Sequence, residues 1–263
     1  MGKVNLKKYL QSVLSVGKKL FIPYIMAGDG GLDALEERIN FLSACGVSAI
    51  ELGIPFSDPV ADGPVIQRAG IRALKNGTTL EGVLERLKAF KESRTVPVII
   101  MTYLNPVFQY GLERFARDAE EAGVSGIIIP DVPLEEEGLI SGVLRKYGIA
   151  HIRLVALTSP EKRAKEIAVR SEGFLYAVSV MGTTGTREKH DAEVGGYLRK
   201  LKKISPVPVL AGFGVSNAEQ ARNLSSFCDG VIVGSKIVQL FNEGKREEIR
   251  RLIMDSVSVG MNV

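Results

Sequence analysis

The chain has 263 residues, of which 45% are hydrophobic and 24% charged, a composition typical of globular proteins and not of disordered chains. Its longest apolar runs are far shorter than the ~18 residues that a membrane-spanning helix needs. The formal net charge is +4, and the 34 basic residues are interleaved with 30 acidic ones. Because nucleic-acid-binding proteins usually concentrate their basic residues, we expect a protein that binds neither nucleic acid nor membrane.

The cysteines and the first residues of the chain bear on its compartment. Cys45 and Cys228 have neither the paired spacing of a zinc site nor the density of a secreted disulfide scaffold. The N-terminal sequence lacks the apolar segment of an export signal. We therefore expect a cytoplasmic protein.

Eight short apolar segments, rich in β-branched residues, recur along the chain. Most are continuous and not alternating, as in parallel strands that are buried on both faces. Their starts are separated by 22 to 49 residues, enough for a crossover helix each time. This alternation predicts an α/β protein with a closed (β/α)8 TIM barrel. The segments begin at residues 21, 48, 97, 126, 151, 173, 208 and 230.

An additional helix is predicted before the first strand. Residues 6–16 place Leu6, Leu10, Val13 and Leu14 on one helical face, which we expect to cover the bottom of the barrel. No linker or shift in composition divides the chain, so residues 1–263 are expected to form one catalytic domain. A doubly wound sheet shares the alternation, but its glycine fingerprint is absent after the first strand, so we favour the barrel.

Three pairs with capping-box spacing predict where helices begin. They are Thr78 with Glu81, Thr158 with Glu161, and Ser216 with Glu219, and Pro160 fits the first turn of the second helix.

Glycines follow three adjacent predicted strands. They lie in GTTGT at 182–186, in GFG at 212–214, and in Gly234–Ser235, which opens a helix. Glycine lets backbone amides approach a ligand, and a helix N-terminus favours an anion. Because the loops at strand carboxyl ends form the active sites of such barrels, we expect a phosphate here. The alternative is that these glycines only make tight turns.

A carboxylate interrupts the second apolar segment. Glu51 lies within SAIELGI, where a buried and unpaired charge would cost several kcal/mol. It either transfers protons at the barrel mouth with a raised pKa or pairs with a basic residue as a structural carboxylate. Asp58 and Asp62 follow in a proline-rich loop, and carboxylates of different exposure suggest divided roles.

Other strand ends carry hydrogen-bonding side chains, namely Tyr103, Asn105, Asp131 and Tyr176. Taken singly, Tyr176 is better explained as a core residue than as a ligand contact, and Asp131 as a turn cap; only their shared rim suggests a site. With only two histidines and no lysine at a strand carboxyl end, the sequence disfavours a metal site, a serine triad and Schiff-base chemistry. Non-covalent acid–base catalysis remains.

At these residues the chain resembles the tryptophan synthase α subunits, and the resemblance extends over nearly its whole length. The most specific motif is ELGIPFSDPVADGP at 51–64. Six further motifs occur in the same order: FIPYIMAGDG at 21–30, MTYLNPVF at 101–108, IIIPDVPLEE at 127–136, YAVSVMGTTGTR at 176–187, GFGVS at 212–216 and VGS at 233–235.

The resemblance implies a lyase that cleaves indole-3-glycerol phosphate by a retro-aldol reaction into indole and glyceraldehyde 3-phosphate. Glu51 then matches the family's acid–base carboxylate, and Asp62 matches the carboxylate that hydrogen-bonds the indole N–H. The other implied positions are Phe21, Tyr103, Tyr176, Thr184 and Phe213 in the substrate pocket, and Gly185, Gly214, Gly234 and Ser235 at the phosphate.

The resemblance also implies a partner and no cofactor on this chain. The family works with a β subunit that carries pyridoxal phosphate and receives indole, in an α2β2 complex. The contact surface would be the loop at 55–63 and the rim at 105–108. Two alternatives remain at this point: another phosphate-handling barrel enzyme, and a catalytically idle regulatory subunit.

Overall fold

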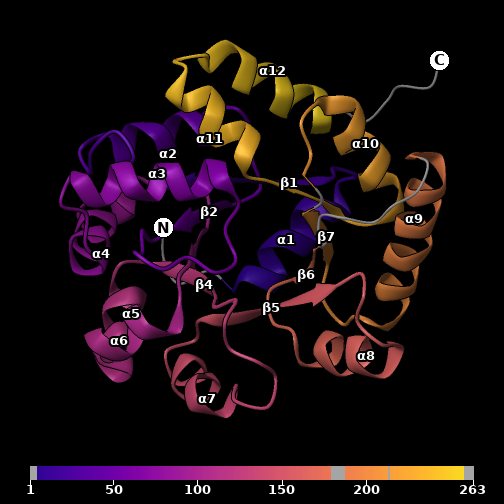
Figure 1. The fold of residues 1–263 in the computed structure, drawn as a ribbon, viewed down its shortest axis with the longest axis horizontal. Helices are drawn as coiled ribbons and strands as arrows, with labels where there is room; N and C mark the ends of the chain where they lie inside the picture. The colour runs from indigo at the N-terminus through magenta and orange to yellow at the C-terminus, as the bar shows by residue number, and fades with distance from the viewer. Residues whose placement is uncertain (1–4, 179–186, 213, 258–263) are drawn as a thin grey trace.

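The computed structural model describes residues 5–178, 187–212 and 214–257. Eight parallel strands close into a barrel in sequence order, each paired with its neighbours and β8 with β1 (Figure 1). All eight predicted strands are therefore confirmed, as is the TIM barrel. The strands are β1 (Leu20–Met26), β2 (Ile50–Gly53), β3 (Val98–Met101), β4 (Val124–Ile128), β5 (Ala150–Ala156), β6 (Leu175–Val178), β7 (Val209–Gly212) and β8 (Gly230–Val233).

Helices surround the barrel as an outer ring (Figure 1). Their apolar faces pack on the outward-facing side chains of the strands; Ile39 of α2 and Leu84 of α4, for example, lie in one core cluster with Ile50 and Val98. After α1, the helices are α2 (Ala34–Ala44), α3 (Pro64–Lys75), α4 (Leu80–Ala89), α5 (Leu104–Tyr110), α6 (Leu112–Glu121), α7 (Gly138–Lys146), α8 (Glu161–Arg170), α9 (Arg187–Ile204), α10 (Ala218–Phe227), α11 (Ser235–Asn242) and α12 (Arg246–Val257), with a 3-10 turn at Lys91–Ser93.

The inside of the barrel is a packed core. Because successive side chains of a strand point to opposite faces, alternate residues of each strand enter the interior. The lower interior is apolar and takes residues from around the whole barrel. Its members are Leu20, Ile22, Ala49, Ile99, Ile128, Ile152, Phe174, Leu210 and Ile232.

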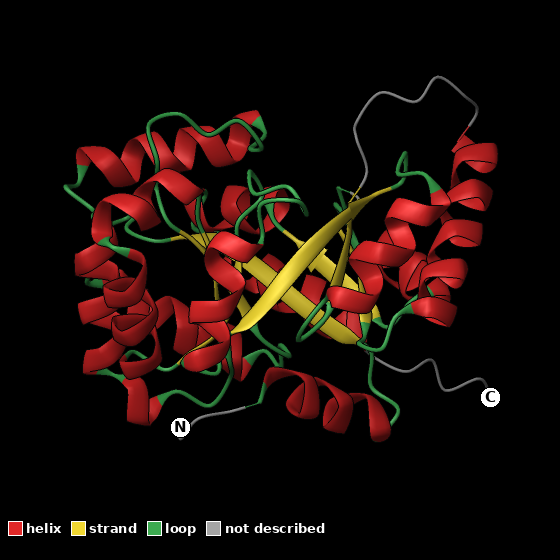
Figure 2. Cartoon of the chain, turned by 90° about the horizontal axis from the view of Figure 1, so that it is seen from below, coloured by secondary structure: helices red, strands yellow, loops and turns green. Residues whose placement is uncertain are grey.

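The predicted N-terminal helix is present as α1 (Leu6–Ser15), and it closes the bottom of the barrel (Figure 2). Its side chains Leu6 and Leu10 are buried in the same cluster as the lower interior. A Cβ built on Gly173, just before β6, would lie 2.7 Å from Leu6 Cδ2, so α1 touches the amino ends of the strands. The amino end of the barrel is thus sealed.

The predicted helix caps are wrong by one or two residues. Helix α4 is capped by Thr79, whose side chain accepts a hydrogen bond from Gly82 N, and not by Thr78. Helix α10 is capped by Asn217 instead of Ser216. Pro160 is itself the N-cap of α8, which has no side-chain cap. In the first two cases the neighbouring residue is also a good cap, so the pattern alone did not fix the register.

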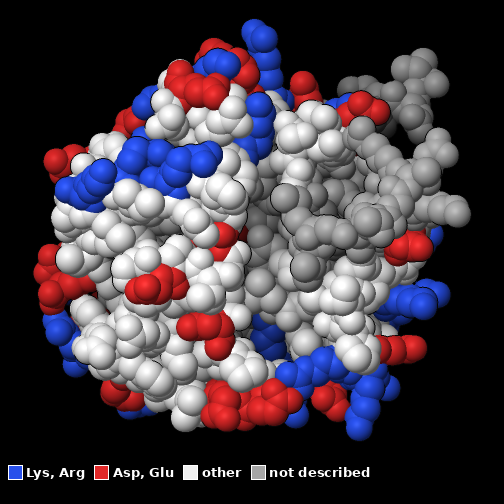
Figure 3. Space-filling model, in the orientation of Figure 1, with Lys and Arg blue, Asp and Glu red and all other residues white. Residues whose placement is uncertain are grey.

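The surface carries charges of both signs, which are interspersed on the face that Figure 3 shows. Within the described part of the chain, no helix combines the length and the hydropathy that crossing a membrane would require.

Candidate active site at the carboxyl end of the barrel

Glu51 of β2 lies inside the barrel, directly above the apolar lower interior. Its register partners are Tyr24 of β1 and Ile99 of β3. The side chain is 1% exposed, and neither carboxylate oxygen has a hydrogen-bond partner among the described residues. Burial, with a smaller contribution from the charge of Asp62, raises the pKa of Glu51 to about 8. The carboxyl is therefore mostly protonated at neutral pH, and it is not a structural carboxylate held by Lys or Arg.

Two tyrosines flank this carboxyl. Tyr24 and Tyr176 lie inside the barrel, and the charge of Glu51 acts on both hydroxyls; burial is the main reason that the pKa of each is well above 10. Each ring occupies space that a glycine on the adjacent strand leaves open. A Cβ on Gly53 would lie 1.9 Å from the Tyr24 hydroxyl, and one on Gly212 would lie 2.3 Å from the Tyr176 ring.

Tyr103 holds the loop between β2 and α3 over the mouth. Its hydroxyl accepts a hydrogen bond from Ala61 N at 3.0 Å, and its ring packs against Phe56 with centroids 5.4 Å apart. The same hydroxyl hydrogen-bonds the Asp62 carboxylate and so opposes the rise in its pKa that burial causes. Burial also raises the pKa of Tyr103, to about 12, so the hydroxyl stays a neutral donor.

The amino end of α11 lies beside these residues. Gly234 is its N-cap and provides no side chain, so within the described residues no side-chain cap binds the first amides of the helix, which begins at Ser235. A Cβ on Gly234 would lie 3.6 Å from Tyr24 Cβ, which places this helix end next to the interior site. Gly214, after β7, has φ +66°, a left-handed conformation that suits glycine. The free amides at the amino end of α11 can bind an anion.

One predicted pocket residue lies elsewhere. Phe21 is fully buried in the outer core, among residues such as Leu35 and Ile39 that belong to the helical ring. It faces away from the barrel interior because its neighbours Leu20 and Ile22 face inward. Tyr24, which the sequence analysis did not select, has the interior position next to Glu51. The continuous apolar segment LFIPYIM has no alternation that could have identified it from the sequence.

Other predicted residues have varied placements. Asp131 accepts a hydrogen bond from Leu104 N, so it caps α5, as the turn-cap interpretation held. Asn105 is exposed on α5. Thr184, Gly185 and Phe213 lie outside the described residues. Over 5–178, 187–212 and 214–257, no group of three His, Cys, Asp or Glu residues has the arrangement of a metal site.

The carboxyl end of this (β/α)8 barrel combines a buried, protonated carboxyl, a second carboxylate on the adjacent loop and an open helix N-terminus. These features define the class of acid–base enzymes that act on phosphorylated substrates. The family model of the tryptophan synthase alpha chain matches residues 10–261. The chain therefore belongs to the tryptophan synthase alpha chain family. It is a carbon–carbon lyase of tryptophan biosynthesis, which cleaves indole-3-glycerol phosphate.

Relatives support this assignment over nearly the full length. The tryptophan synthase alpha chain of Oceanobacillus iheyensis is 60% identical over 257 residues, which are 98% of each chain. That of Bacillus thuringiensis subsp. konkukian is 51% identical over 93% of this chain and 95% of its own. Among solved structures, the alpha subunit from Legionella pneumophila superposes with a TM-score of 0.87 at 35% identity, covering 97% of both chains.

Proposed function

We propose that Glu51 performs both proton transfers of the retro-aldol cleavage. The observation that carries this proposal is its burial without a partner, which raises its pKa to about 8. The protonated carboxyl donates its proton to C3 of the indole. The resulting carboxylate then takes the proton of the glycerol hydroxyl while the bond between C3 and the side chain breaks, and the carbonyl of glyceraldehyde 3-phosphate forms. The carboxyl ends as it began, protonated.

Asp62 has the complementary role of a fixed anion. Protonation at C3 makes an electron-poor ring with positive charge at the nitrogen, and a carboxylate that accepts the N–H hydrogen bond stabilises this charge. The hydrogen bond from Tyr103 favours the ionised form of Asp62. The two carboxyls therefore divide the chemistry. Burial raises both pKa values, that of Glu51 to about 8, while the hydrogen bond from Tyr103 limits the rise for Asp62.

The remaining residues would position the substrate. The amides at the start of α11, with Gly214 and Gly234, would hold the phosphate. Tyr24, Tyr103 and Tyr176 would line the pocket for the indole ring. Thr184, Gly185 and Phe213 stay predictions from the family resemblance.

We further propose that residues 1–263 act as one domain in the cytoplasm, without a cofactor of its own, bound to a β subunit that carries pyridoxal phosphate in an α2β2 complex. Two large apolar side chains on the rim support the contact surface. Val60, on the loop between β2 and α3, is 83% exposed, and Phe108 of α5 is 47% exposed. Because apolar side chains exposed singly are common on protein surfaces, the proposed contact surface rests mainly on the family to which the chain belongs.

The test is indole release from indole-3-glycerol phosphate by the purified chain, alone and with a β subunit. We expect slow release that the partner accelerates. If the chain cleaves a different phosphorylated substrate and releases no indole, another phosphate-handling barrel enzyme would be favoured. Stimulation of the partner without indole release by this chain would indicate a regulatory subunit. Either result would contradict the proposed roles of Glu51 and Asp62.

A further inference from the structure

Asp131, on the loop between β4 and α7, caps a helix that follows a different strand. Its two carboxylate oxygens accept hydrogen bonds from Leu104 N at 3.1 and 3.2 Å. Leu104 is the first residue of α5, which has no acidic residue in its own first turn. Because the first amides of a helix lack partners within it and form its positive end, a carboxylate there is stabilising. Asp131 thus fixes the start of α5 from the next strand of the barrel.

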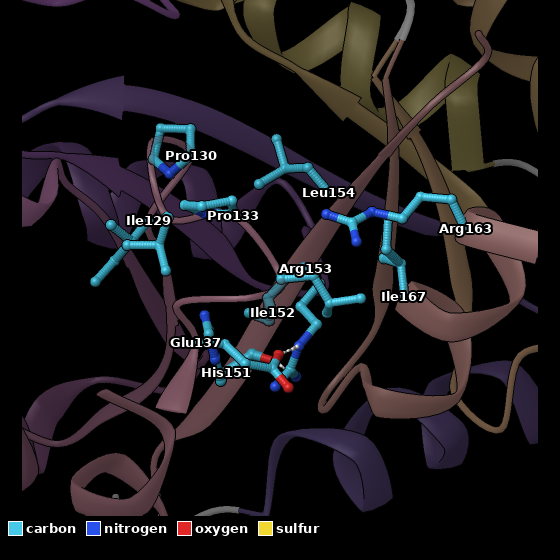
Figure 4. A pocket seen from close by; sticks show the side chains of 12 residues that line it. Ile129, Pro130, Pro133, Glu137, His151, Ile152, Arg153, Leu154, Arg163 and Ile167 are labelled. Atoms are coloured by element: carbon cyan, nitrogen blue, oxygen red, sulfur yellow. Dashed lines mark hydrogen bonds and ion pairs between the residues drawn. The ribbon is translucent and has the colours of Figure 1, made fainter. Parts of the chain in front are cut away.

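The loop that carries Asp131 is itself well held. Pro130 and Pro133 flank the carboxylate, and proline restricts the backbone (Figure 4). At the far end of the loop, Glu137 accepts a hydrogen bond from Arg153 Nε of β5 at 2.6 Å (Figure 4). The cap of α5 is therefore attached to the barrel wall.

Tyr103, the residue before Leu104, connects the start of α5 to the loop between β2 and α3. Its side chain is 4% exposed, and its hydroxyl hydrogen-bonds Ala61 N, 3.0 Å away, and the Asp62 carboxylate. A shift at the start of α5 would move the Tyr103 backbone too, since the two residues share a rigid peptide bond. The contact made by Asp131 therefore affects where Tyr103 holds this loop.

Few other side chains hold the loop between β2 and α3. Of the described side chains outside it, two hydrogen-bond residues 55–63: that of Tyr103, and that of Gln67 in α3, which donates to the Asp62 carbonyl oxygen at 2.9 Å. Phe56 of the loop packs on the same Tyr103 ring. Tyr103 is thus the main contact that joins this loop to the neighbouring one.

We propose that Asp131 is a positioning residue for the cleavage reaction: it holds the start of α5 so that Tyr103 keeps Asp62 in place at the indole nitrogen. It acts through Tyr103 and not by contact with the substrate. The proposal rests on the function proposed above for Asp62, and it adds the loop between β4 and α7 to the site. The alternative is that Asp131 stabilises α5 and has no effect on Asp62.

The groups around Asp62 give this role a signature in the pH dependence. The hydrogen bond from Tyr103 opposes the rise that burial causes in the pKa of Asp62. The charge of Asp62 acts in turn on Glu51 and Tyr24. Loosening Tyr103 should therefore raise the pKa of Asp62. Removing the charge of Asp131 would by itself act in the opposite direction, because a nearby negative charge raises the pKa of a carboxyl.

Amide exchange in the full chain tests the positioning without catalysis. In protein labelled with 15N-alanine, the Ala61 amide, which the variant Ala61→Gly identifies, reports on its hydrogen bond to Tyr103. Tyr103→Phe should remove most of its protection. Asp131→Ala should make it exchange about fivefold faster, the factor that a helix cap is worth in an equilibrium constant.

Steady-state kinetics test the consequence for the reaction. In Asp131→Ala, the acidic limb of the kcat/KM profile should move to higher pH, in the same direction as in Tyr103→Phe but by less. In the double variant, Asp131→Ala should add little to the effect of Tyr103→Phe, because both act on Asp62 through one hydroxyl.

Two further variants separate this role from helix stability. Asp131→Asn keeps an oxygen that can accept from Leu104 N, so it should restore most of the protection of Ala61 and most of the acidic limb. Asn5→Ala removes a cap of the same kind, the hydrogen bond from Lys8 N at 3.1 Å at the start of α1, and should change neither measurement. Near-UV circular dichroism checks the fold of each variant.

The proposal is overturned if the Ala61 amide of Asp131→Ala exchanges as in the wild type, or if Asp131→Ala and Tyr103→Phe have additive effects on the acidic limb. A different result identifies a failure of the function proposed for Asp62. If Asp62→Asn leaves the kinetics unchanged while the Ala61 amide responds to Asp131→Ala, the loops are linked as described, but neither Asp62 nor Asp131 serves the reaction.

Discussion

Tyr24 and Gly53 fit together across the first two strands: the tyrosine hydroxyl occupies the position where any larger residue at 53 would place its Cβ, 1.9 Å away. This fit holds the ring beside Glu51, the register partner of Tyr24. The glycine at the end of β2 is therefore required by the site and not by the turn that follows it.

Gly53→Ala should displace the Tyr24 ring. We expect a loss of about 1 to 3 kcal/mol in the free energy of unfolding, as for other overpacked cores, and a lower kcat/KM. Adding Tyr24→Leu should restore stability but not activity, and urea unfolding of the double-mutant cycle measures the coupling. Gly142→Ala, inside α7 with no atom near its Cβ, is the control and should be neutral or stabilising. Additive effects of the two substitutions would contradict the fit.

Glu51→Gln should nearly abolish kcat while leaving KM largely unchanged. It should also stabilise the fold at high pH. The pKa of Glu51 is about 8 in the folded chain, above the ordinary 4.5, so the native state binds more protons between these values and loses stability as the pH rises through them. The glutamine variant does not titrate, so it keeps the free energy of unfolding that the wild type loses over this pH range, as much as about 5 kcal/mol.

Urea unfolding at about pH 5, 7 and 9 measures this difference, which should grow with pH and then level off. Glu85→Gln, at an exposed position of α4, should show no such trend. A glutamine variant that gains no stability would mean that Glu51 is not buried as a protonated acid.

Tyr103→Phe should act through Asp62. The ring contact with Phe56 remains, but the hydrogen bonds to Ala61 N and to the Asp62 carboxylate are lost. The pKa of Asp62 should then rise further, so the acidic limb of the kcat/KM profile should move to higher pH. Asp62→Asn, which removes the charge, should cost about 10² or more in kcat. An unshifted acidic limb in Tyr103→Phe would exclude the hydroxyl from this role.

Gly234→Asp should raise KM strongly, because it adds a negative charge at the start of α11, where we place the phosphate. The variant Gly234→Ala adds a methyl group without a charge, so it separates the effect of charge on KM from the effect of side-chain size. Its Cβ would lie 3.6 Å from Tyr24 Cβ, an ordinary contact, so this variant should keep most of its affinity. Inorganic phosphate as a competitive inhibitor provides a second readout. Equal KM values for the two variants would move the phosphate site elsewhere.

The start of α4 tests the corrected cap. Thr79→Ala removes the hydrogen bond to Gly82 N and should cost about 1 kcal/mol. Thr78→Val should be neutral or stabilising, because the buried Thr78 Oγ1 has no hydrogen-bond partner among the described residues. Thermal unfolding of the two variants distinguishes them, and the reverse order would favour Thr78 as the cap.

The positions of the eight strands could be predicted from the sequence, but which side chains of each strand face the barrel interior could not. The eight apolar segments stood out because parallel strands buried on both faces need continuous hydrocarbon. For the same reason, no alternation in LFIPYIM tells which residues face inward. Nothing in the segment therefore corrected Phe21, which the family resemblance implied, or pointed to Tyr24. Glu51 was found because a carboxylate in such a segment is unusual on either face.

Contacts between distant segments were not predictable either. The ion pair of Glu137 with Arg153, 16 residues apart, and the contact of His151 with Ser141 depend on how α7 packs on β5. Each residue by itself reads as an ordinary polar side chain. The hydroxyl of Tyr103, which reaches Ala61 from 42 residues away, is a similar case.

Among the described residues, α1 and the lower interior close the amino end of the barrel, which leaves the carboxyl end as the route to Glu51. Substrate enters and both products leave by the same route, so the smaller product cannot escape through the floor while the phosphorylated one is still bound at the rim. Order of release is thus determined at the mouth, and any protein seated there would control the traffic in both directions.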